Sequence, residues 1–355
     1  MENKVILFID KLRKNRKLSL EEYQILLEGY TPEIAEYAAA EAVKVRQQIY
    51  GNKVYVRGLI EISNICKNDC YYCGIRRSNL NCDRYRLSGE EILGCCQEGY
   101  KLGFRTFVMQ GGEDGYYTDD VLCQVVSTIH KEFSDCAITL SMGERSKESY
   151  GRLYDAGASR YLLRHETAEK THYEKLHPIQ MSYENRVRCL KDLKEIGYQV
   201  GCGFMVGSPY QTSLSLAMDL KFVEEFQPDM CGIGPFIPHK DTVFKEEKAG
   251  SVEMTCYLLS LIRLIHPPIL LPATTALGTL DEKGREKGIL SGANVVMPNL
   301  SPMSVRKKYE LYHHKISSGP ESAEGLEELR MRMKAISYEV VCEKGDIIKN
   351  KISYT

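Results

Sequence analysis

The chain has 355 residues, of which 43% are hydrophobic and 27% are charged, as is typical of a globular protein with a buried core. These proportions exclude a collagen-like, coiled-coil or disordered chain. Lysine and arginine number 47 and aspartate and glutamate 48, so a net charge of −1 offers no bulk positive field for nucleic acid or anionic lipid. Asp10, Lys11 and Arg13 break the only apolar run near the start, which is too short for a signal peptide or a membrane span. We therefore expect a cytoplasmic protein that acts on a small substrate or binds a protein partner.

The first 50 residues have the pattern of helices. Ser19 and Glu22 form a capping-box pattern, and Thr31 followed by Pro32 is typical of a second helix start. We expect residues 1–50 to form a helical layer outside the main fold.

Eight short apolar runs follow, each consistent with a strand that is buried on both faces. They cover residues 56–62, 104–109, 136–141, 159–164, 199–206, 230–236, 269–274 and 293–297. Helix signals lie between them, such as the capping box of Ser88 and Glu91 and the periodic apolar residues after Ser182. Alternating strands and helices predict an α/β fold, and eight units favour a complete (β/α)8 TIM-type barrel over residues 51–302 rather than an open sheet. Residues 303–355 are expected to be a helical appendage packed on the barrel.

The chain has thirteen cysteines and no sign of secretion, and an odd number of cysteines cannot all pair within one molecule. We therefore do not expect a disulfide scaffold. Three of them, Cys66, Cys70 and Cys73, follow the first predicted strand, where a barrel carries its active-site loops. Three thiolates can hold a 4Fe-4S cluster and leave one iron open, whereas an electron-transfer cluster uses four protein ligands. The alternatives are a structural zinc, for which Cys82 is the only local fourth ligand, and three unconnected core cysteines. The polar residues between these cysteines favour the cluster.

Other polar residues lie where predicted strands end. The second strand ends in Gln110-Gly111-Gly112-Glu113-Asp114, where glycines let backbone donors approach a ligand and acidic groups can receive an ammonium. Glu166 follows a later strand and Arg186 lies on the next helix, which suits the ammonium and carboxylate of an amino acid. An ordinary turn and a surface ion pair are the alternatives. His165 and His239, also beside strand ends, either touch substrate or satisfy the core.

The C-x3-C-x2-C spacing, with aromatic Tyr72 before the third cysteine, resembles the radical S-adenosylmethionine (SAM) superfamily. The segments IEISNICKNDCYYCGIRRSN, MQGGEDGYY, TLSMGE, RYLLRHETA, GIGPFIPHKDT, LPATTALGT and GANVVMPNLSP together resemble the HydE family of radical SAM maturases of FeFe-hydrogenase. The resemblance extends over residues 50–316, and it is closer than the resemblance to biotin synthase or methylornithine synthase.

The resemblance implies that Cys66, Cys70 and Cys73 bind one 4Fe-4S cluster and that Glu166 and Arg186 hold the amino acid part of SAM. Tyr72 and Ser141 are implied as further cofactor contacts, and Ser141 also lines the substrate cavity. The other implied substrate residues are Arg164, Thr139, Gln110, Thr274, Thr275, Met297 and Tyr309.

In the resembled family, SAM is cleaved reductively to a 5′-deoxyadenosyl radical that attacks the sulfur of a cysteine-bound iron carrying carbon monoxide and cyanide. The implied partners are a small anionic organometallic or amino acid substrate, a tyrosine lyase maturase, a scaffold GTPase and an electron donor, without nucleic acid or membrane. Two alternatives remain. The chain is a related radical SAM enzyme acting on another small amino acid or thioether, or an iron-sulfur binding factor without turnover.

The chain departs from the resembled family beyond Pro302. Many members carry three further cysteines there for a second cluster, whereas this chain has only Cys342. We therefore expect a single cluster. His313 and His314 are interpreted as a solvated pair in a lysine-bearing loop and not as a metal site.

Overall fold

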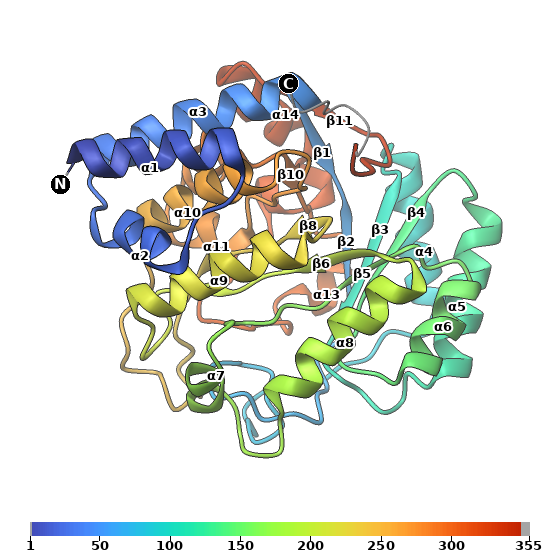
Figure 1. The fold of residues 1–355 in the computed structure, drawn as a ribbon. Coiled ribbons are helices and arrows are strands. Elements are labelled where there is room, and N and C mark those ends of the chain that lie inside the picture. The colour runs from blue at the N-terminus through green and yellow to red at the C-terminus, as the bar shows by residue number, and fades with distance from the viewer. Residues whose placement is uncertain (1, 349–355) are drawn as a thin grey trace.

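The structure is a computed structural model that describes residues 2–348, so parts of the two predicted end layers, residues 1 and 349–355, lie outside the described residues. It begins with three helices, α1 (Glu2–Asn15), α2 (Leu20–Glu28) and α3 (Pro32–Tyr50). The capping box of Ser19 and Glu22 and the helix start at Thr31 and Pro32 are confirmed. α1 and α3 pack on α10 (Val252–Ile265), and α2 packs on α9 (Ser213–Phe226) (Figure 1).

Six parallel strands form the main sheet, in the order β2-β3-β4-β5-β6-β8 (Figure 1). Their bounds are β2 (Gly58–Ser63), β3 (Thr106–Gly111), β4 (Ala137–Ser141), β5 (Arg160–Leu162), β6 (Gln199–Cys202) and β8 (Met230–Cys231). The helices α4 (Gly89–Lys101), α5 (Asp119–Glu132), α6 (Lys147–Asp155), α7 (Lys170–Leu176), α8 (Tyr183–Ile196) and α9 lie between them in the chain. The predicted alternation of parallel strands and helices is therefore confirmed.

Two smaller sheets complete the strands. β7 (Met205–Val206) pairs with β9 (Gly234–Pro235), and β1 (Lys53–Val56) lies between β10 (Val295–Val296) and β11 (Glu339–Val341). The predicted strand at 269–274 is wrong as a regular strand, because only isolated bridges form at Leu270 and Pro272, and a proline has no N–H to donate. Backbone hydrogen bonds still join this segment to its neighbours, since Cys231 N–H donates to Leu270 O (3.0 Å) and Asn294 N–H to Leu271 O (2.9 Å).

The last third of the described chain consists of helices joined by loops and short turns. After α10 come α11 (Thr275–Leu280), α12 (Gly284–Leu290), α13 (Met303–Arg306) and α14 (Leu326–Ala335), with short 3-10 turns at Gly319–Glu321 and Ala323–Gly325. β11 then pairs in parallel with β1, with Lys53 opposite Glu339. The end of the described chain thus returns to the strand that follows the N-terminal helices.

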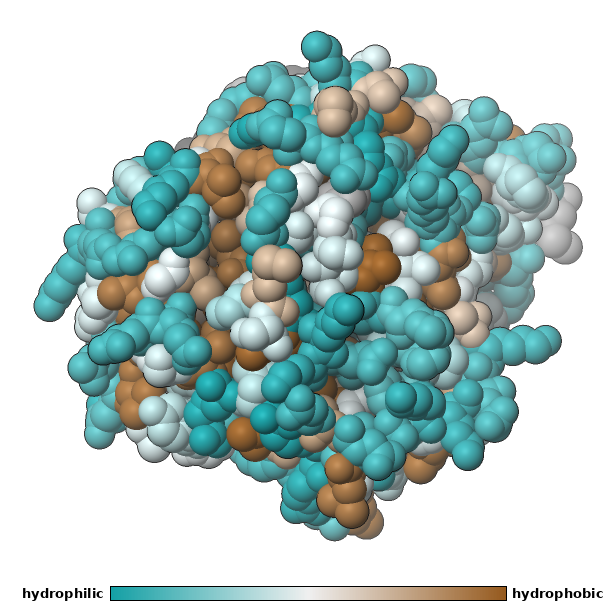
Figure 2. All heavy atoms as spheres, turned by 180° about the vertical axis from the view of Figure 1, so that it is seen from behind, coloured by the Kyte–Doolittle hydropathy of each residue, from teal (hydrophilic) through white to brown (hydrophobic). Residues whose placement is uncertain are grey.

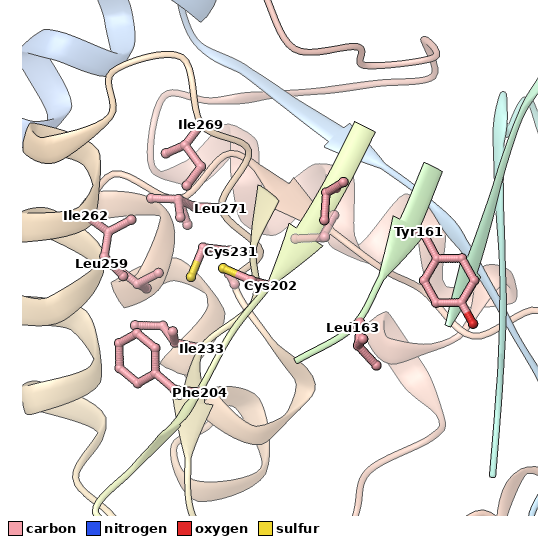
Figure 3. Packing of buried hydrophobic residues seen from close by; sticks show 14 of the residues in the cluster. Tyr161, Leu163, Cys202, Phe204, Cys231, Ile233, Leu259, Ile262, Ile269 and Leu271 are labelled. Carbon is pink, nitrogen blue, oxygen red and sulfur yellow. The ribbon is translucent and has the colours of Figure 1, made fainter. Parts of the chain in front are cut away.

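Alternating side chains on the strands separate an outer face from an inner face. Tyr161 and Leu163, on and just after β5, belong to the hydrophobic core that Figure 3 shows together with residues of β6 and α10. Because successive strand residues point to opposite faces, Arg160 and Leu162 lie on the inner face. Arg164 lies two residues beyond the end of β5, where a continuation of this alternation directs it to the inner side of the sheet.

The same alternation places Glu61 of β2, Gln110 of β3 and Ser141 of β4 on the inner face, since their strand neighbours pack in the outer core. Glu61 is in register with Gln110, and Gln110 with Ser141, so the three form one layer. Thr139 is in register with Arg160 in the layer nearer the start of the strands. The inner face therefore carries polar side chains in at least two layers.

The surface carries no obvious continuous apolar face in the rear view, where mostly hydrophilic residues surround scattered hydrophobic ones (Figure 2). The large hydrophobic side chains that are most exposed, Leu80 and Ile179, lie in loops. Within residues 2–348, no helix has the length and apolar character that crossing a membrane requires.

Candidate functional site

The three cysteines of the motif lie on the loop that follows β2. All three thiols are free, and the Glu113 N–H donates to Cys66 Sγ at 3.3 Å. Cys73 N–H donates to Cys70 O at 3.1 Å, which folds the loop back on itself. The loop is also anchored from a distance, because Tyr71 N–H donates to Leu176 O at 3.0 Å.

Burial raises the pKa of the thiols of Cys66, Cys70 and Cys73, that of Cys73 to about 12. The other thiols of the motif raise the pKa of Cys70 and Cys73 further, because neighbouring thiolates repel one another. A bound cationic metal centre reverses this balance, because it stabilises deprotonated sulfur. Three neighbouring, half-buried thiols are therefore a donor set that fits an iron-sulfur cluster.

Gly112, at the end of β3, is required by the cysteine loop. A Cβ atom at this position would lie 2.3 Å from Ile65 O and 2.8 Å from Cys66 Cβ. Asp114 does not fulfil the prediction of an ammonium-binding group, because its carboxylate accepts from Arg86 Nε and from Ser63 Oγ, both at 2.7 Å. This part of the motif therefore holds the loop and does not offer a free carboxylate.

Tyr72 lies in a small apolar cluster with a histidine at its edge. Its hydroxyl lies 3.2 Å from His177 Nε2, while His177 Nδ1 lies 2.9 Å from Tyr173 O. Since the carbonyl can only accept, Nδ1 carries the proton and Nε2 accepts from Tyr72. The Tyr72 ring is thus fixed against Leu176 and Phe236 beside the cysteine loop.

Arg186, at the buried face of α8, pairs with an acidic residue that the sequence interpretation did not single out. Its Nε lies 2.7 Å from Glu144 Oε1, just after β4. Burial opposes the charge of Arg186, but Glu144 together with Tyr173, Glu113 and Tyr72 outweighs burial and holds the pKa of Arg186 well above its ordinary value. The signal in the sequence was the position of Glu144 after a strand end, in TLSMGE.

Glu166 pairs with Arg164 and not with Arg186. Arg164 Nη2 lies 3.3 Å from Glu166 Oε2, and neither of these buried atoms has a hydrogen-bond partner among the described residues. Glu166 has a φ of +67°, and its N–H donates to Gly203 O at 3.0 Å. A charged pair with unused donors and acceptors at the strand ends is suited to receive a polar ligand.

His165 satisfies the core. Its Nε2 lies 3.1 Å from Asp219 Oδ1, which also accepts from the Ala168 N–H at 2.6 Å, and both side chains are fully buried. The Gly203 N–H donates to His165 Nδ1 at 3.4 Å, so Nε2 carries the proton. Asp219 was not found from the sequence, because it is 54 residues away on α9.

Three of the predicted substrate residues lie on or beside the inner face. Tyr309 is buried, and its hydroxyl accepts from Gln110 Nε2 at 3.4 Å. Thr139 Oγ1 is buried without a hydrogen-bond partner and lines a small interior cavity of about 10 Å³ together with Arg160. That cavity is not lined by Arg164, so the predicted grouping of Thr139 with Arg164 in one cavity is not seen in this structure.

Of the remaining predicted residues, the two threonines are hydrogen-bonded within the protein and the other two are half-buried. Thr274 Oγ1 donates to Ile233 O at 3.3 Å, and Thr275 Oγ1 accepts from Arg285 Nη2 at 3.3 Å. Met297 is half-buried against an apolar cluster that includes Leu162. Ser141 is half-buried at the end of β4.

The loop after α13 carries His313, His314 and Lys315 in different surroundings. His314 is exposed, and His313 Nδ1 lies 3.8 Å from Glu310 Oε1. Lys315, however, is not solvated: it forms a buried ion pair with Glu61 on the inner face, with 8% and 0% of the two side chains exposed. Neither partner was found from the sequence, because the pair joins residues 254 positions apart.

Comparisons with known proteins agree with this site. A model of the radical SAM superfamily matches residues 60–223. The FeFe-hydrogenase maturase subunit HydE of Thermotoga maritima is 46% identical over 275 residues, which cover 78% of each chain. The 3-methylornithine synthase of Methanosarcina acetivorans is 29% identical over 293 residues, which cover 81% of each chain. The crystal structure of methylornithine synthase (PylB) has a TM-score of 0.81 and 25% identity and covers 94% of this chain and 97% of its own. From this identity and coverage, the chain belongs to the HydE family of FeFe-hydrogenase maturases and is a radical SAM enzyme.

Proposed function

We propose that this enzyme takes part in assembling the active-site cluster of FeFe-hydrogenase. The observation that carries the proposal is the arrangement at the strand ends, where three half-buried thiols on one loop lie at the same edge of the sheet as the Arg164–Glu166 pair. The name of the relative from Thermotoga maritima supports the same conclusion. We place the protein in the cytoplasm, with a tyrosine lyase maturase, a scaffold GTPase and an electron donor as partners.

Cys66, Cys70 and Cys73 would hold one 4Fe-4S cluster with one iron left open. When bound, the cluster and SAM supply an electron and a 5′-deoxyadenosyl radical. Arg186 offers its guanidinium to the carboxylate of SAM, and Glu166 offers to the ammonium its Oε2, which is paired with Arg164 but accepts no hydrogen bond among the described residues.

The buried surroundings serve this binding. Tyr72 provides a fixed aromatic wall beside the loop, since its hydroxyl is already bonded to His177. Ser141 lies on the inner face where the cofactor and substrate would meet. Both residues therefore orient a ligand and exclude water and do not react.

The proposed substrate is a cysteine-bound iron carrying carbon monoxide and cyanide, with the cysteine sulfur as the point of attack. Arg164, whose Nε and Nη2 make no hydrogen bond among the described residues although Nη2 is paired with Glu166, suits an anionic complex better than a neutral one. Gln110, Tyr309 and Thr139 add polar contacts on that face. Thr274, Thr275 and Met297 are proposed as more distant walls.

The sheet that carries these residues is proposed to be a complete (β/α)8 barrel over residues 51–302. Backbone hydrogen bonds that continue past β8 support this, including one from Leu59 N–H to Pro298 O of 2.9 Å. Residues 1–50 would be a helical layer and residues 303–355 an appendage.

The test has two stages under anaerobic conditions. The reconstituted protein, given SAM and dithionite, is expected to release 5′-deoxyadenosine, whereas an iron-sulfur binding factor would release none. The same protein, with the tyrosine lyase, the scaffold GTPase and unmatured hydrogenase, is expected to restore hydrogen evolution. Release of 5′-deoxyadenosine without maturation would favour a radical SAM enzyme for another amino acid or thioether.

A further inference from the structure

Lys315 comes from outside the main sheet but has its charged end inside the fold. Its ammonium pairs with the Glu61 carboxylate and donates to Tyr309 O at 3.1 Å. The Nζ atom also lies 5.0 Å from the centroid of the Tyr309 ring. The lysine side chain is 8% exposed and that of Glu61 is fully buried.

The position of this ammonium follows from strand register. Glu61 is in register with Gln110, and both point to the inner face. Tyr309 bridges from the lysine to the same layer, because its hydroxyl accepts from Gln110 at 3.4 Å. The Lys315 ammonium therefore lies next to the layer where the proposed substrate residues gather.

The segment that carries Lys315 is fixed to the cysteine loop. Gly74, directly after Cys73, donates its N–H to Leu311 O at 2.8 Å, and Asn64 Nδ2 donates to Lys308 O at 2.7 Å. A Cβ atom at Gly74 would lie 2.2 Å from Glu310 O, so the two segments are in close contact. This contact holds Lys315 in a constant position relative to the proposed cluster.

The hydrogen bonding of the ammonium is incomplete. A lysine ammonium has three N–H donors, and the described residues supply two acceptors, the Glu61 carboxylate and Tyr309 O. Burying a charged group with an unused donor costs free energy unless a further acceptor is bound. The Glu61 carboxylate has partners at both oxygens, since Lys315 pairs with one and Asn299 Nδ2 donates to the other at 2.8 Å. One N–H of Lys315 therefore has no acceptor among the described residues.

We propose that Lys315 is a substrate-binding residue, whose free N–H binds a carboxylate of an amino-acid-derived substrate. This inference rests on the proposed function and extends it, because it assigns a binding group from the segment after the barrel. Glu61 and Asn299 are positioning residues that hold the ammonium in its orientation. Lys315 and Arg164 then provide two cationic contacts on the inner face, which favours an anionic substrate over a neutral thioether.

The experiment compares four reconstituted proteins in the complete maturation system, with the tyrosine lyase product as the varied component. They are the wild type, Lys315→Met, the double variant Lys315→Met/Glu61→Gln, and Lys307→Met, which changes an exposed lysine of the same segment. The double variant removes both charges, so it leaves no unpaired buried carboxylate. Iron content and uncoupled release of 5′-deoxyadenosine are measured for every protein.

We expect the double variant to keep its iron and its uncoupled SAM cleavage within about twofold, while the substrate concentration for half-maximal maturation rises about tenfold or more. Lys307→Met should match the wild type in all readouts. Maturation by the double variant at wild-type substrate concentration would overturn the proposal and leave the pair a structural one. Loss of iron together with SAM cleavage in the double variant would overturn it too. A wild-type protein that does not mature hydrogenase would instead refute the proposed function.

Discussion

Arg186 Nε lies 2.7 Å from Glu144 Oε1, so the arginine that is proposed to bind SAM already has a carboxylate partner in the free protein. Arg186 and Glu144 are 9% and 16% exposed, which shields their interaction from water. A SAM carboxylate must therefore share this guanidinium with Glu144 or displace it.

Because Arg186 and Glu144 are paired, substitutions of the two residues should affect SAM binding differently. Arg186→Leu should weaken SAM binding about tenfold or more, since it removes a charged hydrogen bond worth roughly 1.5 to 3 kcal/mol. Glu144→Gln should leave SAM binding equal or tighter, because it frees the guanidinium from a competing charge. Equilibrium dialysis with labelled SAM on reconstituted protein measures both. Equal weakening in the two variants would mean that the pair acts as one structural unit.

The cysteine assignment is tested by iron content. Replacing Cys66, Cys70 or Cys73 by Ala should abolish the cluster and SAM cleavage together, because two thiolates hold a cubane poorly. The wild type should contain about four irons per chain. Cys82→Ala is the matched control, since this thiol lies nearby but accepts a hydrogen bond from Asn64 Nδ2 at 3.4 Å. A Cys70→Ala protein with four irons and normal cleavage would contradict the assignment.

Local signals in the sequence predicted local structure well. The capping box of Ser88 and Glu91 is present at the start of α4, and Ser182 caps α8, because these contacts join residues three positions apart. The period of the apolar residues likewise predicted parallel strands between helices. The segment at 269–274 had the same apolar composition, but Pro272 interrupts its hydrogen bonding.

The contacts inside the site could not be predicted in this way. The pair of Glu61 and Lys315 joins residues far apart in the chain, and no local pattern indicates which of 48 acidic residues meets a given lysine. The motif around Asp114 suggested a ligand, but only the structure shows that Arg86 and Ser63 occupy its carboxylate. Sequence spacing thus located the site, while tertiary contacts decide which of its groups are free.

His177 predicts a loss of stability in mild acid. Burial lowers the pKa of His177 to about 3, below its ordinary value near 6.5. The unfolded chain therefore binds a proton below pH 6.5 that the folded chain does not, so the stabilisation present above pH 6.5 is lost as the pH falls toward 3. Protonation of Nε2 would also break its hydrogen bond from Tyr72.

We expect His177 to lower the free energy of unfolding by about 1.4 kcal/mol between pH 7.5 and 5.5. The reason is that pH 5.5 is about one unit below the ordinary histidine pKa, and each unit is worth about 1.4 kcal/mol. Urea unfolding at the two pH values measures it. His177→Leu is less stable overall, since it leaves polar partners unsatisfied, but its stability should fall less over the same pH interval. An unchanged pH dependence in the variant would show that this histidine does not titrate on unfolding.

The buried contact between His165 and Asp219 supports the backbone next to Glu166, and it allows the most selective test. Burial raises the pKa of the Asp219 carboxyl well above its ordinary value, and Oδ2 has no hydrogen-bond partner among the described residues. Oδ1 accepts both hydrogen bonds, from His165 and from Ala168. Asp219→Asn keeps an oxygen in this position, whereas Asp219→Ala leaves two buried donors without an acceptor.

We therefore expect Asp219→Asn to stay within about 1 kcal/mol of the wild type in stability and to bind SAM normally. Asp219→Ala should lose about 2 to 6 kcal/mol of stability, from two unsatisfied donors at roughly 1 to 3 kcal/mol each. Because these donors flank Glu166, which is held at a φ of +67°, the alanine variant that still folds should also bind SAM more weakly at unchanged iron content. Thermal unfolding and SAM titration on the same preparations measure the two effects. If the asparagine variant is as unstable as the alanine variant and binds SAM as weakly, a negative charge on Asp219 is required. If SAM affinity is normal in both variants, the contact stabilises the fold without positioning Glu166.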